Sequence, residues 1–309
     1  MNLSCDSPPT SDALAAIRRL LVHIEANLTE PLSLADLAAA ADYSPFHLHR
    51  VFGALAGVPL MSYVRNRRLD ESVVDLLNDR GSVLDLAIRY GFGFEQSFTR
   101  AFSRRFGTTP ARFRRSPKAV RIAAPLAVQE PRGGGILAEP AFLVCPQRVL
   151  VGRSSQVALD RDRIEGLANG AARAFMQTDA PRIQACLSRQ VYFGYVKPVH
   201  PMTGFATYVP SLEVRPDAPL PSGLQRYVIP ARRFAVFRYV GWHAPEALNF
   251  AKLSALLDSI FLDWLPHAAW RLDPAFHLES VDLSRCSPDF TEAQIHIPGA
   301  PIGKPIGRC

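Results

Sequence analysis

The sequence has little cysteine, and its five cysteines are widely scattered. They include no C-x-x-C pair and no spacing typical of metal ligands, so neither a disulfide framework nor a zinc site is expected. We expect reduced thiols, as in a cytoplasmic protein, and no metal or other cofactor. The five positions are Cys5, Cys145, Cys186, Cys286 and Cys309.

Long apolar runs are also missing. No window approaches the roughly 18 consecutive apolar residues that indicate a membrane span. The N-terminus is polar and acidic, unlike the basic and then apolar start of an export signal. The sequence therefore predicts a cytoplasmic protein that has no membrane partner.

Acidic residues are outnumbered by basic ones, and the excess is concentrated in one stretch. Lys and Arg number 35 against 28 Asp and Glu, which gives a formal net charge of +7. Between Glu95 and Arg121 there are eight basic residues and a single acid. A local basic excess predicts a polyanionic partner, although charge alone does not separate DNA from RNA or an anionic membrane.

A chain of 309 residues with 48% hydrophobic and 20% charged residues is expected to fold as two domains. The first, over residues 12–116, shows the periodicity of helices and has Ser33, Ser44 and Ser82 placed as helix caps. Residues 1–11 are expected to be a disordered N-terminus. We expect an all-α domain with helices over residues 12–28, 33–41, 44–56, 60–78, 82–90 and 94–106.

This domain repeats itself at an offset of 50 residues. Residues 48–52 align with residues 98–102, and Gly57 then falls on Gly107. In both copies the apolar residues occupy one helical face and leave a polar face opposite. The outward residues are Phe46, His49, Arg50 and Gly53 in the first copy, and Gln96, Thr99, Arg100 and Ser103 in the second.

A short helix, a tight turn and a longer helix form the helix-turn-helix unit, whose second helix enters the DNA major groove. The outward faces suit this role, because Arg pairs with guanine, Gln with adenine, and Phe46 with a thymine methyl group. The helix between the copies, roughly 19 residues, would span about 28 Å. With its flanking turns it brings the two recognition helices close to the roughly 34 Å of one DNA turn, so a monomer could bind adjacent grooves.

A plain helical bundle with solvated outward residues would explain one such pattern, but two copies with the same polar face favour binding of double-stranded DNA. The basic stretch after Gln96 could likewise be an ordinary solvated face. Because it adjoins the second recognition helix, we expect Arg104 and Arg105 to contact phosphates there.

The two units SLADLAAAADYSPFHLHRVF and LDLAIRYGFGFEQSFTRAFSRRFGTTPARFRRS resemble the DNA-binding domain of AraC/XylS-family regulators, in the arrangement where this domain comes first. The resemblance covers residues 12–117. It departs from the family at Phe46, where Trp is common, and at His49 and Glu95, where Gln is common. The operator sequence therefore cannot be copied from relatives. The base-reading residues that the resemblance implies are Phe46, His49, Arg50, Glu95, Gln96, Thr99 and Arg100.

A second domain is expected over residues 140–299, after a linker over residues 117–139 that is rich in proline and contains three consecutive glycines. Short runs such as QVYFGYV and FAVFRYV indicate strands, and residues 161–176 and 245–265 show helical patterns. We expect an α+β domain, followed by a C-terminal tail over residues 300–309.

The phrases AFLVCPQRVLVGRSS, QRYVIPARRFAVFRYVGW and QIHIP resemble the GyrI-like small-molecule-binding domain. The resemblance implies two β-α-β-β modules that form a curved antiparallel sheet around an aromatic cleft with a central carboxylate. Whether His277 or Glu279 takes the position of that carboxylate stays open. The effector-binding residues that it implies are Tyr195, Phe205, Tyr208, Tyr239, Trp242, His277 and Glu279.

These features together predict a DNA-binding transcription regulator, an activator that works with RNA polymerase and responds to a lipophilic or amphipathic ligand. Two alternatives are that the C-terminal domain binds a protein partner, or that it hydrolyses a reactive small molecule, as some GyrI-like proteins do. The sequence has no G-x-S-x-G motif, metal cluster or paired acids at fixed spacing, so we do not expect an enzyme.

Overall fold

The computed structural model describes residues 10–78, 81–117, 120, 122–132, 134–158, 167–197 and 204–301. The chain divides into a helical unit, residues 11–128, and a sheet unit that starts at Gln129. The expected termini, residues 1–11 and 300–309, lie largely outside the described residues, although a helix begins at Thr10 and a strand ends at Pro301. Within the described ranges, no helix is long and apolar enough to cross a membrane.

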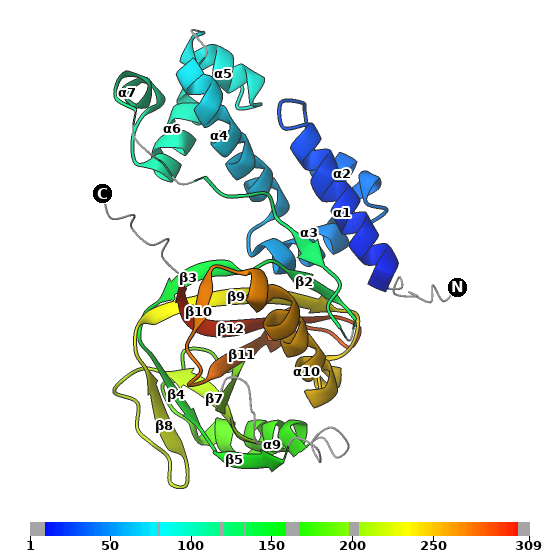
Figure 1. Cartoon of the computed structure of the whole chain (residues 1–309), viewed down its shortest axis with the longest axis vertical. Helices are drawn as coiled ribbons and strands as arrows, with labels where there is room; N and C mark the ends of the chain where they lie inside the picture. Colours follow the sequence, from blue (N-terminus) through cyan, green and yellow to red (C-terminus); the bar gives the residue numbers. More distant parts are fainter. Residues whose placement is uncertain are drawn as a thin grey trace. The chain divides into compact units, whose positions relative to one another are not determined.

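The helical unit consists of helices throughout, as expected from the sequence (Figure 1). Within the unit, α3 packs against the start of the long helix α4, and α6 packs against its second half. The helices are α1 (Thr10–Ala26), α2 (Leu34–Ala40), α3 (Pro45–Ala56), α4 (Leu60–Asn78), α5 (Val83–Arg89), α6 (Glu95–Phe106) and α7 (Pro110–Arg115).

Local capping interactions set the limits of these helices. The Ser44 side chain caps the start of α3, and proline occupies the first turn, where no backbone donor is needed. Ser82 and Asp85 form a reciprocal capping box at the start of α5. Gly57 and Gly107 end the two recognition helices with φ of 71° and 69°, a left-handed conformation that glycine adopts without steric cost.

A buried carboxylate joins α4 to the second half of the unit. Asp70 has 1% of its surface exposed. Its two oxygens accept hydrogen bonds from Arg105 of α6, where Nε lies 2.6 Å from Oδ1. Arg67, one turn earlier on α4, donates to both carboxylate oxygens of Glu25 of α1. These ion pairs fix α4 between α1 and α6.

The segment expected as a linker is divided between the two units. The Ala123 amide donates to Asp70 Oδ2 over 3.2 Å, and the Leu126 amide donates to the Tyr63 hydroxyl over 3.0 Å. Residues 123–126 therefore run along the helical unit. Further on, Ile136 and Leu137 pair with strand β9 and belong to the sheet unit.

The sheet unit contains a mainly antiparallel sheet whose main path runs β1-β2-β9-β12-β11-β6-β7-β4-β8. Strand β3 also pairs with β9, β5 with β7, and β10 with β12. The strands are β1 (Val128–Gln129), β2 (Ile136–Ala138), β3 (Ala141–Cys145), β4 (Arg148–Gly152), β5 (Ser155–Ala158), β6 (Val191–Lys197), β7 (Phe205–Val214), β8 (Gln225–Ile229), β9 (Arg232–Gly241), β10 (Trp270–Leu272), β11 (His277–Asp282) and β12 (Thr291–Pro301).

Two similar halves build this sheet. In one half β4 is followed by helix α9 (Leu167–Ala174) and the hairpin β6–β7, and in the other β9 is followed by α10 (Phe250–Asp258) and the hairpin β11–β12. The halves join where β6 pairs with β11. Both helices continue into π-helical turns, Phe175–Asp179 and Ser259–Trp264. The predicted fold of two β-α-β-β modules is confirmed.

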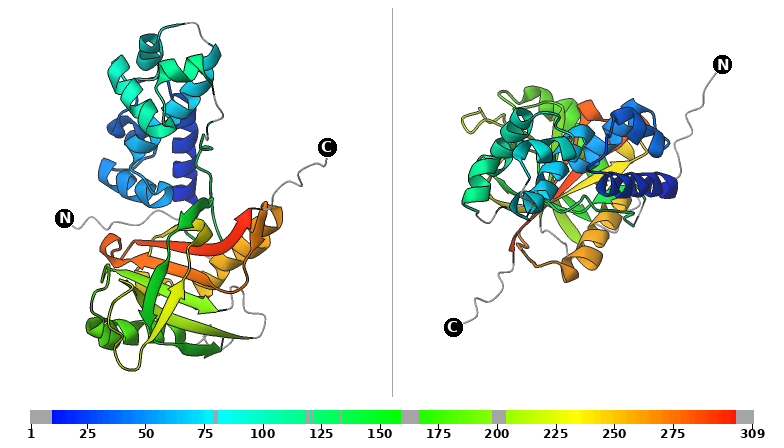
Figure 2. Two further views of the ribbon diagram at one scale, coloured as in Figure 1. Left: turned by 90° about the vertical axis from the view of Figure 1, so that its left-hand side faces the viewer. Right: turned by 90° about the horizontal axis from the view of Figure 1, so that it is seen from above.

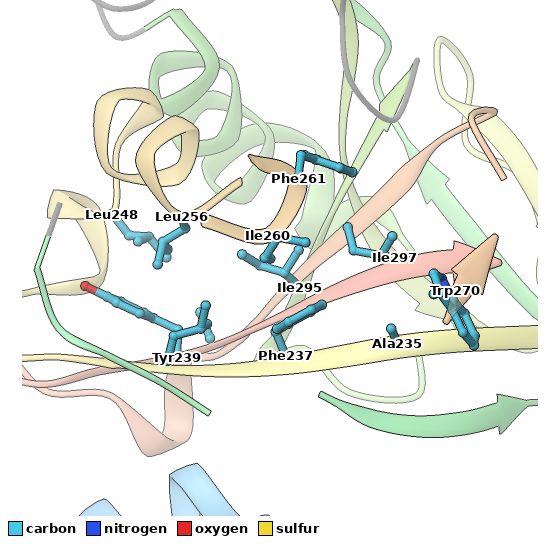
Figure 3. Close-up of a cluster of buried hydrophobic side chains, with 12 residues drawn as sticks. Ala235, Phe237, Tyr239, Leu248, Leu256, Ile260, Phe261, Trp270, Ile295 and Ile297 are labelled. Atoms are coloured by element: carbon cyan, nitrogen blue, oxygen red, sulfur yellow. The ribbon is translucent and has the colours of Figure 1, made fainter. Parts of the chain in front are cut away.

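An apolar core lies between the sheet and α10, and it holds that helix in place (Figure 3). Phe237 of β9 and Ile295 of β12 point toward Leu256 and Ile260, and all four side chains are buried. Strands β9 and β12 supply these contacts because alternate residues of a strand face one side. Figure 2 shows α10 against the sheet from two further directions.

Candidate DNA-binding and ligand-binding sites

The first recognition helix, α3, exposes the side chains that the sequence assigned to DNA. Phe46 is 80% exposed, and His49 is also exposed, whereas Arg50 is half-buried. Leu48 and Phe52 are fully buried on the opposite face. The Phe46 ring at the start of α3 is therefore accessible to a partner such as a thymine methyl group.

The second recognition helix, α6, has the same organisation. Glu95, Gln96 and Arg100 are exposed, and Thr99 is half-buried. The structure adds one residue that the sequence analysis missed, because Phe94 is 74% exposed directly before α6. In the repeat alignment this position corresponds to the capping residue Ser44. A phenylalanine in place of a helix-capping serine is the signal in the sequence that points to Phe94.

Arg105 does not lie on this face in the way that the sequence predicted. Its guanidinium forms two hydrogen bonds with buried Asp70, and its central carbon lies 5.6 Å from the centre of the Phe106 ring. A charge already paired in this way is not available to clamp a phosphate. We therefore remove Arg105 from the DNA-binding set, whereas Arg104, one position earlier, is exposed and stays in it.

Helix α7 extends the basic surface. Arg112 and Arg115 are exposed, whereas Arg114 points into the unit and donates to the carbonyls of Leu76 and Gly81 over 2.9 and 2.8 Å. Arg114 therefore holds α7 against the rest of the unit, and its exposed neighbours are placed to meet phosphates. The expected basic residues at positions 118 and 121 lie outside the described residues.

The sheet unit contains a cavity of about 980 Å³. Its floor is the sheet, where Val196, Ala206 and Ile295 contribute from β6, β7 and β12. Helices α9 and α10 form its walls, with residues such as Met176 just beyond α9 and Leu257 on α10. Most of these side chains are apolar, and the volume lies within the range of pockets that bind small molecules.

A small group of polar side chains lies on the cavity floor. Glu279 Oε1 accepts a hydrogen bond from His277 Nε2 over 3.2 Å. The hydroxyls of Tyr192 and Tyr208 are hydrogen-bonded to each other. Burial, together with the neighbouring Tyr208 and Glu279, raises the pKa of Tyr192 well above its ordinary value, so this phenol is neutral.

A glycine makes room for this polar group. Gly194 lies directly across from Glu279 in the β6–β11 pair. A Cβ atom at this position would lie 2.9 Å from Glu279 Oε2 and 3.0 Å from a ring carbon of Tyr208. The absence of a side chain at 194 therefore allows both groups to lie side by side on the floor.

Three of the expected effector residues, Tyr208, His277 and Glu279, line the cavity. Both candidates for the central acid are present there, and they are hydrogen-bonded to each other. Tyr192 also lines the cavity. The sequence analysis missed Tyr192, because the run QVYFGYV does not reveal which of its alternate residues face the cavity.

The other four expected effector residues do not line the cavity. Tyr195 lies on the opposite face of β6, in a cluster with Phe276 and Tyr227. Phe205 begins β7 and is largely exposed, with its neighbour Ala206 facing the cavity instead. The remaining two lie elsewhere in the unit: Tyr239 is in the core beside α10, and Trp242 follows the end of β9. We therefore leave Tyr195, Phe205, Tyr239 and Trp242 out of the proposed site.

The matches to known proteins lie mainly in the helical unit. A family profile described as a helix-turn-helix domain matches residues 37–116. The HTH-type transcriptional activator AarP of Providencia stuartii is 41% identical over 100 residues, which cover 32% of this chain and 74% of AarP. The chain belongs to the AraC/XylS family. Its two recognition helices are thus those of an AraC-type DNA-binding regulator.

For another relative, the matched region is longer than the run of helices. The right origin-binding protein of Escherichia coli strain K12 is 37% identical over 155 residues, or 50% of this chain. The chain spans about half the length of this relative, 52%. Among solved structures, SAV2435 bound to tetraphenylphosphonium is 15% identical, covering 52% of this chain and 94% of that chain, with a TM-score of 0.37.

Proposed function

We propose that this AraC-family regulator binds one promoter site as a monomer in the cytoplasm and activates transcription with RNA polymerase, under control of a ligand in the sheet unit. The observation that carries the first part is the pair of matching outward faces on α3 and α6, with Arg50 and Arg100 at equivalent positions of the repeat. Both faces come from one chain, so a dimer is not needed to present two recognition helices.

Selection of bound duplexes from a random pool tests this arrangement. We expect the purified full chain to enrich an asymmetric site with two short elements whose centres lie about 10 base pairs apart, one DNA turn. Light scattering of the complex should give one chain per duplex. Enrichment of a palindrome, or of a single short element, would contradict reading by both helices of one chain.

For the ligand, the cavity supports a lipophilic cation. Its apolar walls would cover the body of such a molecule, while Glu279 supplies a negative charge and Tyr192 and Tyr208 supply aromatic faces. The resemblance to GyrI-like domains agrees with this ligand class. We propose that the cavity binds its ligand without converting it.

Replacement Glu279→Gln should weaken binding of tetraphenylphosphonium by roughly 10- to 100-fold, because it removes the charge from the cavity floor and keeps its shape. Isothermal titration of the full chain measures the dissociation constant. Tetraphenylborate, of similar size and opposite charge, should bind the variant better than the unmodified protein.

The matched control is Glu246→Gln, which removes an exposed carboxylate at the cavity rim. Solvent screens this charge, and exposed ion pairs contribute little energy. The control should therefore change the affinity by less than about threefold. Equal losses in the two variants would contradict a specific role of Glu279. Chromatography of the ligand after incubation should recover it unchanged, and a turnover product would contradict a pure receptor.

A further inference from the structure

Helix α6 begins in a different way from several of its neighbours in the helical unit. Helices α2, α3, α5 and α7 each start with a hydroxyl side chain that accepts a hydrogen bond from a first-turn amide, namely Ser33, Ser44, Ser82 and Thr109. The same place before α6 is taken by Phe94, in extended backbone with φ of −131°, and no side-chain hydrogen bond from this residue caps the helix. A phenyl ring offers no acceptor to the helix amides, so α6 starts without a stabilisation that these four helices have.

Packing does not account for a phenylalanine at this position either. Of the two aromatic rings in the turn between α5 and α6, Phe92 packs on the core, with its ring centre 5.3 Å from that of Phe98 in edge-to-face contact. Phe94 is 74% exposed. A phenylalanine stabilises a fold by burying its apolar surface, and here most of that surface stays in water. The residue breaks a local rule without a gain in stability, as residues at functional sites do.

Each copy of the repeat presents one exposed phenylalanine, but at positions two residues apart. At the offset of 50, Phe94 corresponds to Ser44, and Phe46 corresponds to Gln96. The first copy therefore has a cap and then a ring on the second residue of α3, whereas the second copy has a ring in the capping position and an amide side chain where Phe46 would be. Phe46 is 80% exposed, much as Phe94 is. Both recognition helices consequently begin with an accessible ring.

The ring of Phe94 belongs to the end of α6 that is expected to meet the bases. Residues 93–97 are all exposed, and Glu95 and Gln96 directly follow the ring. The first residues of the second helix of a helix-turn-helix unit reach the base edges in the major groove. Polar base edges call for donors or acceptors, which a phenyl ring lacks. The apolar group that the major groove presents is the C5-methyl group of thymine.

We propose that Phe94 contacts a thymine methyl group in the DNA element bound by α6, and that α6 lacks a helix cap because this contact takes the capping position. The inference rests on the proposed binding of DNA by both recognition helices. Covering the methyl group with the ring supplies affinity only where thymine occupies the position. Phe94 is therefore a specificity-determining residue, and the free protein has a less stable start of α6 as a result.

Deoxyuridine is thymidine without the C5-methyl group, so it tests the contact directly. Each thymidine of the selected duplex is replaced in turn, and fluorescence anisotropy measures the affinity of the full chain. We expect sensitive positions about 10 base pairs apart, one for Phe94 and one for Phe46. At each of them the replacement should weaken binding about three- to tenfold, the value of one buried methyl group.

The variant Phe94→Ser replaces the ring with the residue that caps α3 at the equivalent position. It should bind the thymidine duplex about as weakly as the unmodified protein binds the deoxyuridine duplex, and it should be insensitive to deoxyuridine at one of the sensitive positions. The matched control Phe46→Ala removes a similarly exposed ring from α3 and should abolish the sensitivity at the other position. This double-mutant cycle isolates the contact between ring and methyl group.

Urea unfolding tests the absence of the cap. Phe94→Ser gains a capping hydroxyl and loses little packing, so the midpoint seen by circular dichroism should rise by about 0.3 to 0.5 M. A residue with a purely structural role would not combine weaker, less specific binding with higher stability on replacement. A lower midpoint in Phe94→Ser would overturn the inference.

The other outcomes separate this inference from DNA binding itself. If Phe94→Ser keeps the full deoxyuridine sensitivity of the unmodified chain, the ring reads no methyl group, and the inference is overturned while the recognition helices stand. Equal weakening on the selected, deoxyuridine and scrambled duplexes would mean a contact with the sugar-phosphate backbone and would overturn it as well. A scan of the unmodified chain without any sensitive position overturns it with no variant needed. If that chain selects no duplex from the random pool, the proposed function fails, and the inference fails with it.

Discussion

The double substitution Arg50→Ala with Arg100→Ala is expected to weaken binding to the selected duplex by roughly 2 to 6 kcal/mol. Each arginine reading a guanine contributes about 1 to 3 kcal/mol, and the losses should add because the two arginines belong to different helices that pack against different parts of α4. Fluorescence anisotropy with the selected duplex and with a scrambled duplex of the same length measures the change.

Specificity distinguishes base reading from simple charge attraction. The double variant should bind the scrambled duplex almost as well as the unmodified protein. The matched control, Arg112→Ala with Arg115→Ala, likewise removes two positive charges, both from exposed side chains of α7. It should weaken binding to both duplexes equally and reduce the salt dependence of binding. If the recognition-helix variant behaved like this control, base reading by Arg50 and Arg100 would be refuted.

The substitution Asp70→Ala is expected to destabilise the helical unit by about 3 to 5 kcal/mol, because it leaves the charge of Arg105 without its partner in a partly buried site. The Ala123 amide loses its acceptor as well. The control is Glu71→Ala, which removes the exposed carboxylate that lies 3.7 Å from Arg67. It should cost less than about 1 kcal/mol.

Urea unfolding of the full chain can follow the two units separately. The three tryptophans, Trp242, Trp264 and Trp270, all belong to the sheet unit, so their fluorescence reports on that unit. Far-ultraviolet circular dichroism is dominated by the helices. Asp70→Ala should lower the midpoint seen by circular dichroism and leave the fluorescence transition in place. Equal shifts in both signals, or in both variants, would contradict a local role of Asp70.

The helical unit could be predicted from the sequence because its signals are local. Capping serines, glycines at helix ends and apolar residues three or four positions apart all act within a few residues of one another. The repeat then added a second, independent reading of the same pattern. These signals suffice to predict α3 and α6 and their outward faces from the sequence alone.

Arg105 shows where such reasoning stops. Its position in the basic last turn of α6 favoured phosphate binding, but its partner Asp70 lies 35 residues earlier in the chain. An ion pair between distant segments follows from how the helices pack, and no spacing in the sequence predicts it. The same holds for the backbone contact between Ala123 and Asp70, which turned part of an expected linker into a segment of the helical unit.

The ligand site was harder to predict for a different reason. In a strand the side chains alternate between two faces, and QVYFGYV carries aromatic residues on both. Residue type alone therefore could not separate Tyr192, which lines the cavity, from Tyr195, which packs behind the sheet. His277 and Glu279 both line the cavity, because residues two apart in one strand share a face.

Gly194 determines the shape of the cavity floor, because it leaves space for Glu279 and Tyr208. It is the point where the backbone of β6 passes beneath Glu279 and Tyr208 without a side chain of its own. A residue with a side chain at this position would displace the acid or the phenol and reshape the space above them. The helices that read DNA belong to a separate unit. Within one family, a regulator could thus acquire a new inducer through a change at this position while still recognising its original promoters.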